Sequence, residues 1–297
     1  MSCPFCNHIE NKKSYLPSTK FNNKIFHYLS CAKCELIYTT PIPTLEDFEK
    51  MYPPSYQNGA DTKILTNQYK KLIGLRFSYG YQFDLLKKFN YNGIILDYGC
   101  GTGNFIANAS NQGFECVGAE YNLKHVESLK KAMPNDFYLV DEVLSGKTGK
   151  FDIIRLSNVL EHLPEPREVI DKLTPQLNKG GILLFEGPIE TNPSLALMTR
   201  KFYFNLRKKL KPKWKANHVP THMFFSNRKN QLHFFKHFEL ETLHYKIKEA
   251  EWPYPASVLG AQGFGGKLKA IIAKVSIGLN YLNKNWGNTF IYVGRKK

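Results

Sequence analysis

The sequence predicts an α/β protein, built on a mostly parallel sheet with helices on both faces. Two observations predict it: apolar runs of strand length alternate with segments of helical spacing, and three glycines follow the first run closely. Such alternation is typical of parallel strands joined by crossover helices. The seven expected strands are Ile94–Asp97, Glu115–Gly118, Phe137–Val140, Ile153–Ser157, Ile182–Glu186, and two late ones near Phe238–Lys248 and Thr289–Gly294.

Helices are expected between these strands, at about 104–113, 122–133 and 165–177. Apolar residues also recur at helical spacing over Asn67–Phe89, which predicts a helix ahead of the sheet. The stretch Pro193–His237 is helical and basic, interrupted by "KANHVPTHMFFS", and a glycine-rich stretch before the last strand predicts a loop and a helix.

These patterns divide the chain into three parts. Residues 1–40 form a cysteine-bearing unit, 41–92 a linker with N-terminal helices or a lid, and 93–297 the sheet domain. Helical insertions are expected in the sheet domain at about 190–237 and 253–285. A chain of 297 residues, 42% of them hydrophobic, is long enough to bury a sizeable core.

The composition favours a cytoplasmic protein with no membrane span. No run of 18 or more apolar residues exists, and "MSCPFCNHIENKK" lacks the apolar stretch of a signal peptide. A net charge of +16 suits a nucleic-acid or acidic-surface partner, but its spread along the chain equally describes a lysine-rich surface. One cluster, Arg200–Lys215, interleaves basic and aromatic residues. It suits phosphate, a nucleotide-linked substrate or a membrane surface, or simply a solvated helix.

Four cysteines near the N-terminus predict a metal site. They form two Cys-x-x-Cys pairs, Cys3 with Cys6 and Cys31 with Cys34, separated by 24 residues. Two such pairs hold one Zn²⁺ with four thiolates, a closed ligand set that serves structure rather than chemistry. The sequence therefore predicts a zinc ribbon whose folding depends on the metal. The distant Cys100 and Cys116 thiols are expected to be unreactive core groups, since both lie in apolar strands or turns.

The stretch "LDYGCGTGNF" places three glycines between a strand and a helix. Gly99, Gly101 and Gly103 would let the backbone approach a ligand at the carboxyl end of the sheet, where the helix start offers unpaired N–H groups. Asp97, at the strand tip, suits a cationic or hydroxylic group. The dinucleotide fingerprint Gly-x-Gly-x-x-Gly is broken here, because its third position is Asn104.

The spacing Asp-x-Gly-x-Gly-x-Gly resembles the first motif of class I S-adenosylmethionine-dependent methyltransferases. "VGAEYN", "FDIIRLSNVLEHLPEP" and "GGILLFEGP" resemble later segments of the same family, in the family's order, over roughly residues 75–250. The resemblance implies a Rossmann-like fold that binds S-adenosylmethionine. In that fold Gly99 and Gly101 would cradle the methionine moiety of the cofactor, Asp97 would support its ammonium group, and Glu120 would take the two ribose hydroxyls.

The remaining cofactor contacts are expected on the neighbouring strand ends. Asp141 would lie near the adenine amine, although Glu142 suits that role as well and Asp141 equally suits a helix cap. Aromatic side chains such as Tyr98 and Phe105 would form walls of the pocket or simply pack. The resemblance also places Cys100, Gly103, Tyr121 and Asn158 in the cofactor-binding set.

Histidines are the candidates for a general base. In the segment that resembles the fourth-strand motif, His162 and Glu161 are adjacent, so on a helix one would face the cofactor and the other the substrate. "NHVPTHMFFS" supplies His218 and His222, and its histidine ahead of aromatic residues resembles polysaccharide and lipid-quinone methyltransferases. Each histidine equally suits a cap or a packing role. Methyl transfer from a sulfonium requires no catalytic metal, since the enzyme mainly positions the two reactants.

Two classes of acceptor fit the sequence. A zinc ribbon with these segments resembles small-molecule O-methyltransferases of sugar and surface-polysaccharide biosynthesis, whose nucleotide-linked or glycan-linked substrates would suit the basic cluster. The alternative is an RNA methyltransferase, because some of these also carry a cysteine ribbon and a basic chain suits a polyanion. "SNVLEH" stands where amino-group methylators place Asn or Asp followed by two prolines, which favours the small-molecule class. The intact glycine loop argues against a third class, a catalytically inactive binding or scaffold protein.

Overall fold

The structure is a computed structural model that describes residues 2–53, 61–72, 79–89, 93–211, 214–215, 219–249 and 257–297. His218 lies outside the described residues, as does the middle of the helix expected over Asn67–Phe89. On either side of that gap the structure has two helices, α2 (Thr62–Leu72) and α3 (Gly80–Lys88).

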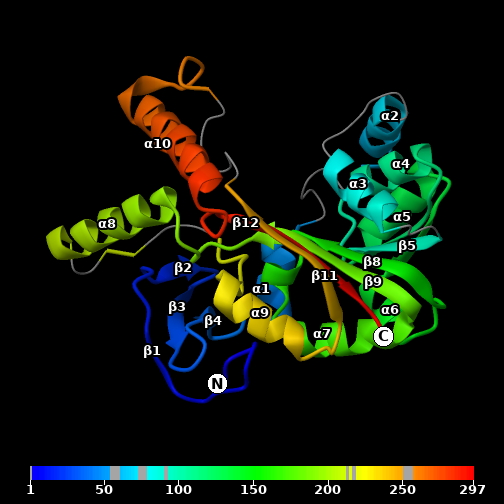
Figure 1. The fold of residues 1–297 in the computed structure, drawn as a ribbon, viewed down its shortest axis with the longest axis horizontal. Helices are drawn as coiled ribbons and strands as arrows, with labels where there is room; N and C mark the ends of the chain where they lie inside the picture. The colour runs from blue at the N-terminus through cyan, green and yellow to red at the C-terminus, as the bar shows by residue number, and fades with distance from the viewer. Residues whose placement is uncertain are drawn as a thin grey trace.

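A seven-stranded sheet forms the centre of the molecule and confirms the predicted mostly parallel architecture (Figure 1). Its strand order is β11-β12-β9-β8-β5-β6-β7. The five strands from β9 to β7 pair in parallel, whereas β12 runs antiparallel to both of its neighbours. The strands are β5 (Ile94–Tyr98), β6 (Glu115–Glu120), β7 (Asp136–Leu139), β8 (Phe151–Ser157), β9 (Leu177–Pro188), β11 (Glu241–Lys248) and β12 (Thr289–Arg295).

Apolar residues on both sides of each central strand explain why these runs lack alternating polar positions. Ile95 and Ile153 pack on one face of the sheet, and their chain neighbours Leu96 and Ile154 pack on the other. A parallel sheet that is covered on both faces requires such continuous apolar runs. The first face is covered by α3, α4 (Asn104–Asn111) and α5 (Leu123–Ala132), and the second by α6 (Val140–Leu144), α7 (Pro166–Leu173) and α9 (Arg228–Lys236).

The N-terminal cysteine unit shares its core with the sheet domain. Its strands are β1 (Asn11–Lys13), β2 (Thr19–Phe21), β3 (Lys24–Cys31) and β4 (Ile37–Thr40), and β10 (Phe224–Phe225) from the sheet domain pairs with β4. The Phe5 ring stacks on Phe234 of α9, with ring centroids 4.2 Å apart. The N-terminal unit is therefore packed as part of the second face's core and not as a tethered attachment.

Helix α1 (Leu45–Met51) connects the cysteine unit to the sheet domain. Thr44 and Asp47 form a capping box at its start, and Lys24 on β3 holds the buried Asp47 carboxylate at 2.7 Å. This cap fixes the direction of the helix. The following residue, Tyr52, thereby reaches the carboxyl end of the sheet, where it contacts His162.

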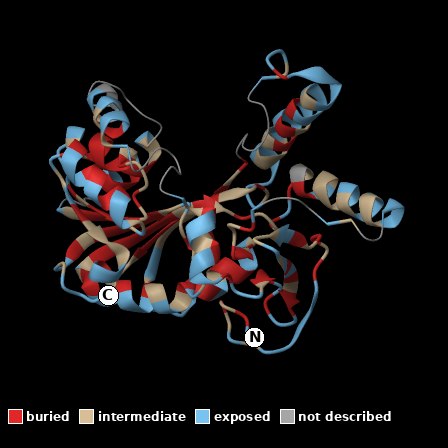
Figure 2. Cartoon of the chain, turned by 180° about the vertical axis from the view of Figure 1, so that it is seen from behind, coloured by how far each residue is buried: buried red, intermediate tan, exposed pale blue. Residues whose placement is uncertain are grey.

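Two helices, α8 (Leu195–Leu210) and α10 (Gly263–Leu282), project away from the body of the molecule (Figure 1). Coloured by burial, both helices are largely exposed or half-buried along their length (Figure 2). Helix α8 lies within the stretch 190–237 and α10 within 253–285. Within the part of the chain that the structure describes, no helix combines the length and apolar character that crossing a membrane requires.

Candidate active site

A cavity of about 290 Å³ opens at the carboxyl ends of β5, β6 and β8. Its walls come from the end of α1, the glycine loop after β5, the end of β6, and the segment after β8. Open α/β sheets bind ligands at this edge, at the point where the strand order reverses. In this sheet that point lies between β5 and β8. Six of the predicted site residues line it: Gly99, Gly101, Glu120, Tyr121, Asn158 and His162.

The glycine loop has the backbone that only glycine adopts without strain. Gly99 and Gly103 have φ of +75° and +73°. A Cβ at Gly99 would lie 2.5 Å from the Val159 side chain, and one at Gly103 would lie 2.7 Å from Met133. The loop therefore excludes side chains for reasons of both conformation and space, and α4 begins directly after it at Asn104.

Glu120 connects the end of β6 to the glycine loop. Its carboxylate accepts hydrogen bonds from the backbone N–H groups of Gly101 and Tyr121, both at 2.9 Å. Burial raises the pKa of Glu120, and these two N–H donors oppose that rise. Each carboxylate oxygen keeps a further lone pair, so the group can still accept two hydroxyl donors.

Asp97 is placed differently from the expectation that it meets the cofactor directly. It is buried, and its Oδ1 accepts a 2.5 Å hydrogen bond from Arg155 Nη1 on β8. Arg155 is held in turn by Gln82 of α3 and stacks over the Phe105 ring. Burial raises the pKa of Asp97, with Arg155 opposing. Asp97 Oδ2 is buried without a hydrogen-bond partner, so one acceptor remains unused beneath the loop.

The other predicted cofactor residues lie beside the cavity. Cys100 and Gly103 are part of the loop without lining the cavity, and burial raises the pKa of the Cys100 thiol. Glu142, and not Asp141, caps α6, because its carboxylate accepts from Leu139 N at 2.7 Å. Asp141 does not line the cavity, but burial and, to a smaller extent, the charge of Asp141 raise the pKa of nearby Tyr98.

His162 reaches the cavity from a short 3-10 helix, Leu160–His162, that follows β8. Its Nδ1 lies 2.9 Å from both the Thr221 carbonyl oxygen and the Tyr52 hydroxyl. Because a carbonyl can only accept, Nδ1 carries the proton in this arrangement and Nε2 is the unprotonated nitrogen. Burial, with a smaller contribution from His222, lowers the pKa of His162 to about 4.

His222 packs edge-on against His162, with ring centroids 4.8 Å apart. Its Nδ1 donates to Glu190 Oε2 at 2.8 Å, and Glu190 follows β9. Burial lowers the pKa of His222, but the Glu190 hydrogen bond and charge outweigh it and the net shift is upward. Arg200 of α8 donates to the Glu190 backbone carbonyl at 2.5 Å. The pKa values of the two histidines are therefore shifted in opposite directions, upward for His222 because it is hydrogen-bonded to a carboxylate and downward for His162 because it is buried.

Glu161 does not line the cavity, and its carboxylate lies beside the two histidines, whereas the sequence predicted that Glu161 and His162 would point in different directions. Glu161 is 4% exposed, and burial raises its pKa to about 7, against a lowering by His222. Its Oε1 lies 3.7 Å from His162 Nε2. The ligand atoms of Glu161, His162 and His222 all lie within 4.8 Å of one another, so these three side chains are close enough to share a metal ion.

Sequence reasoning missed three residues at this site. Tyr52 and Glu190 bond to the two histidines, and His125 of α5 lines the cavity with its Nε2 buried and unpartnered. Glu190 lies two residues after the motif "GGILLFEGP", where a polar residue at a strand end could have been noted. No motif in the sequence marks Tyr52, because it lies in the proline-rich segment that predicts a linker or lid.

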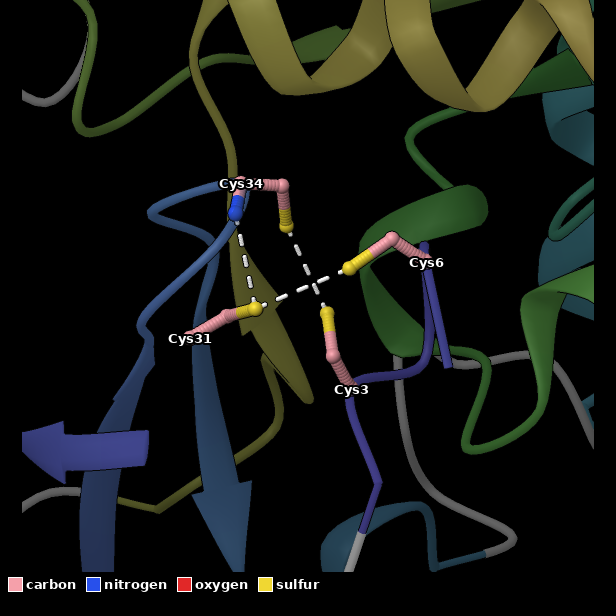
Figure 3. Close-up of side chains that lie close together, drawn as sticks. All are labelled: Cys3, Cys6, Cys31 and Cys34. Atoms are coloured by element: carbon pink, nitrogen blue, oxygen red, sulfur yellow. Dashed lines mark hydrogen bonds between the residues drawn. The ribbon is translucent and has the colours of Figure 1, made fainter. Parts of the chain in front are cut away.

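The four N-terminal cysteines converge on one point (Figure 3). Their Sγ atoms lie within 4.8 Å of one another, with Cys3–Cys34 at 3.5 Å and Cys6–Cys31 at 3.6 Å. A tetrahedral Zn²⁺ with Zn–S bonds of 2.3 Å separates its sulfurs by about 3.8 Å.

The backbones of the two pairs are alike. Residue i+4 donates to the carbonyl of the first cysteine, Asn7 to Cys3 and Glu35 to Cys31, and both donors have positive φ. The donor set and its geometry therefore fit zinc.

Comparison with known proteins defines the class. Residues 76–245 match the family described as "Methyltransferase domain", more than half of the chain. The chain therefore belongs to this family, and its fold and class are those of the S-adenosylmethionine-dependent methyltransferases.

Among curated proteins, the chain is similar to two enzymes named ubiquinone biosynthesis O-methyltransferase. That of Chromobacterium violaceum is 29% identical over 31% of this chain and 42% of its own length. That of Histophilus somni is 27% identical over 52% of this chain and 66% of its own length. The chain spans less than half the length of the first curated relatives that it matches. A solved methyltransferase from Archaeoglobus fulgidus has a TM-score of 0.44 and 15% identity, covering 84% of this chain and 98% of its own.

Proposed function

We propose that the protein transfers the methyl group of S-adenosylmethionine to a hydroxyl of a small-molecule acceptor. The observation that carries the proposal is that the glycine loop, Glu120 and His162 line one cavity. The glycine loop and Glu120 suit the cofactor, and His162 suits the acceptor. The cavity of about 290 Å³ is of the size of a small-molecule site, as the cofactor requires.

The residues present fit S-adenosylmethionine. Glu120 would accept the ribose hydroxyls, and the loop at Gly99 and Gly101 would receive the methionine moiety where no Cβ is in the way. His125 also lines the cavity, which makes it a candidate for a polar contact with the nucleoside. When bound, the cofactor supplies an electrophilic methyl group on a sulfonium.

His162 is the residue that the geometry favours as general base. Its Nδ1–H is held by Thr221, so Nε2 is free to take the proton of the acceptor hydroxyl as its oxygen forms the new bond to the methyl carbon. Glu161, 3.7 Å from Nε2, would stabilise the imidazolium that results. His222 donates its Nδ1–H to Glu190 and does not line the cavity, so it is the second candidate for the base.

For the acceptor, we propose a sugar or nucleotide-linked sugar hydroxyl, with a phenolic hydroxyl as the second candidate. The ribbon and the basic cluster at Arg200–Lys215 support the first. The names of the curated relatives and the aromatic cavity walls, Phe48, Tyr52, Tyr98 and Tyr121, support the second.

Incubating the purified protein with the cofactor and either nucleotide sugars or catechol-type phenols, then analysing products by mass spectrometry, tests the proposal. We expect a gain of one methyl in one class. A gain in neither, together with methylation of RNA, would reject it.

We also propose that Cys3, Cys6, Cys31 and Cys34 hold a structural Zn²⁺ as thiolates. Support comes from the sulfur distances and from the backbone pattern that the two pairs share. With all four positions of the metal taken by the protein, the site has no open position for a substrate. Metal analysis of the purified protein should find one zinc per chain.

A further inference from the structure

The projecting helices α8 and α10 expose apolar side chains in continuous stripes. On α8, Met198, Phe202, Leu206 and Leu210 recur every four residues, and Phe202 and Leu210 are both 71% exposed. On a helix, residues at this spacing lie along one face. A helix that packs on a protein core carries its apolar stripe inward. Here the stripe faces outward.

Helix α10 also has an apolar stripe that faces outward, and the two most exposed residues of that stripe are more exposed than any on α8. Its exposed stripe comprises Phe264, Leu268, Ile271, Val275 and Leu282, at heptad-like spacing, with Phe264 84% and Leu282 85% exposed. Its buried face is made of small residues, Ala270, Ala273 and Ser276. The five apolar residues of the stripe are therefore directed away from the protein, whereas Ile272, Ile277 and Leu279 are half-buried.

The inner face of α8 is fixed to the cysteine unit, so its outer face is held in one direction. Lys208 donates to the Tyr15 carbonyl at 2.6 Å, and Phe204 packs on the cluster of Leu16, Tyr28 and Ile37. The end of α10 is tied to the start of α8, because Gly287 N donates to the Pro193 carbonyl at 3.0 Å. The two stripes thus extend from a common base.

The charge of both helices has a single sign. Leu195–Leu210 contains five Lys and Arg residues, Gly263–Leu282 contains three, and neither range contains Asp or Glu. Two copies of this surface would bring like charges together, which opposes self-association. The exposed cations beside the two stripes are Lys209 of α8 and Lys267, Lys269 and Lys274 of α10, because Arg200 and Lys208 of α8 donate to backbone carbonyls on its inner side. Such basic residues beside an exposed apolar stripe fit the interface of an anionic membrane, where apolar side chains enter the acyl boundary and lysines meet phosphate headgroups.

We propose that α8 and α10 together form a docking surface for an anionic phospholipid membrane. The helices lie on the membrane and do not span it, because the 20-residue α10 carries Lys267, Lys269 and Lys274 among its apolar residues. The inference goes beyond the proposed methyl transfer and does not depend on it.

Co-sedimentation with lipid vesicles tests the proposal on the full chain. Wild-type protein should pellet with vesicles of phosphatidylglycerol and phosphatidylcholine, and should remain in solution with phosphatidylcholine alone. Equal binding to both, or binding to neither, would overturn the proposal. A dimer in light scattering without vesicle binding would assign the surface to a second copy of the chain instead.

Two variants separate the apolar and basic contributions. Phe202→Ser with Phe264→Ser removes apolar insertion, and Lys209→Gln with Lys267→Gln and Lys269→Gln removes charge. Each should weaken vesicle binding by roughly tenfold or more. If the basic variant alone loses binding, the surface is a general polyanion site, and the membrane assignment is wrong.

A matched control excludes the net charge as the cause. Lys131→Gln with Lys150→Gln and Lys179→Gln removes the same three charges from exposed positions on the sheet domain. This variant should bind vesicles like wild type, and a loss equal to that of the basic variant would reject the proposal. Unfolding temperatures of all variants show that each is folded. Should the double apolar variant unfold, Phe202→Ser alone provides the same comparison.

Discussion

His162 and Tyr52, 110 residues apart in the chain, meet in a 2.9 Å contact between the imidazole Nδ1 and the phenol oxygen. This contact joins the end of α1 to the segment after β8, on the wall of the cavity. It places a neutral imidazole, with its Nδ1–H also directed to the Thr221 carbonyl, beside the glycine loop. The candidate base is thus fixed by two segments that are remote in sequence.

We expect His162→Ala to lower turnover roughly a hundredfold or more, the scale of a lost general base. Cofactor affinity should be almost unchanged, because Glu120 and the glycine loop remain. Steady-state kinetics and calorimetry measure the two quantities. His233→Ala, an exposed histidine on α9, is the matched control and should behave like wild type. If His162→Ala keeps full turnover, His162 is not the general base and only packs in the structure.

Glu120→Ala should weaken cofactor binding by roughly tenfold or more, because a charge-assisted pair of hydrogen bonds is lost. It also frees the Gly101 N–H that the carboxylate now holds at 2.9 Å. Calorimetry with S-adenosylmethionine gives the affinity. Glu127→Ala, on the exposed face of α5, serves as the control. An unaltered affinity for the Glu120 variant would exclude the ribose role.

Cys3→Ser should release the metal and lower the unfolding temperature, since metal binding supplies folding energy to small cysteine units. Cofactor binding should stay largely intact without zinc, because the four cysteines do not line the cavity. Turnover, however, should fall, because Thr39 of β4 holds the backbone at His222 and Met223. Cys116→Ala, a buried cysteine outside the cluster, should keep its zinc. Equal losses of turnover and cofactor affinity would mean that the ribbon supports the whole cavity.

His125 gives stability a pH dependence. Burial lowers its pKa to about 4, from an ordinary value of 6.5 in the unfolded chain. A group with a depressed folded pKa contributes stability above the unfolded pKa, and this is lost as pH falls from about 6.5 towards 4. His125→Gln should flatten this part of the curve of unfolding free energy against pH. Denaturant titrations at several pH values measure it, and an identical slope in both proteins would contradict the assignment.

The sequence by itself determined the local features of this protein. Apolar runs without polar alternation fixed the central strands, glycines that tolerate positive φ at Gly99 and Gly103 fixed the loop, and the spacing of Cys3, Cys6, Cys31 and Cys34 fixed the thiol cluster. Each of these depends on conformations or spacings that a short stretch of chain carries within itself.

Only the tertiary structure decided which distant groups meet. It assigned Asp97 to Arg155, His222 to Glu190 and His162 to Tyr52, and it merged the cysteine unit with the core of the sheet domain. It also turned the apolar stripes of α8 and α10 outward, where helical periodicity alone predicts a buried face. Periodicity reports that a helix has two faces, whereas packing against the rest of the chain determines which face is covered.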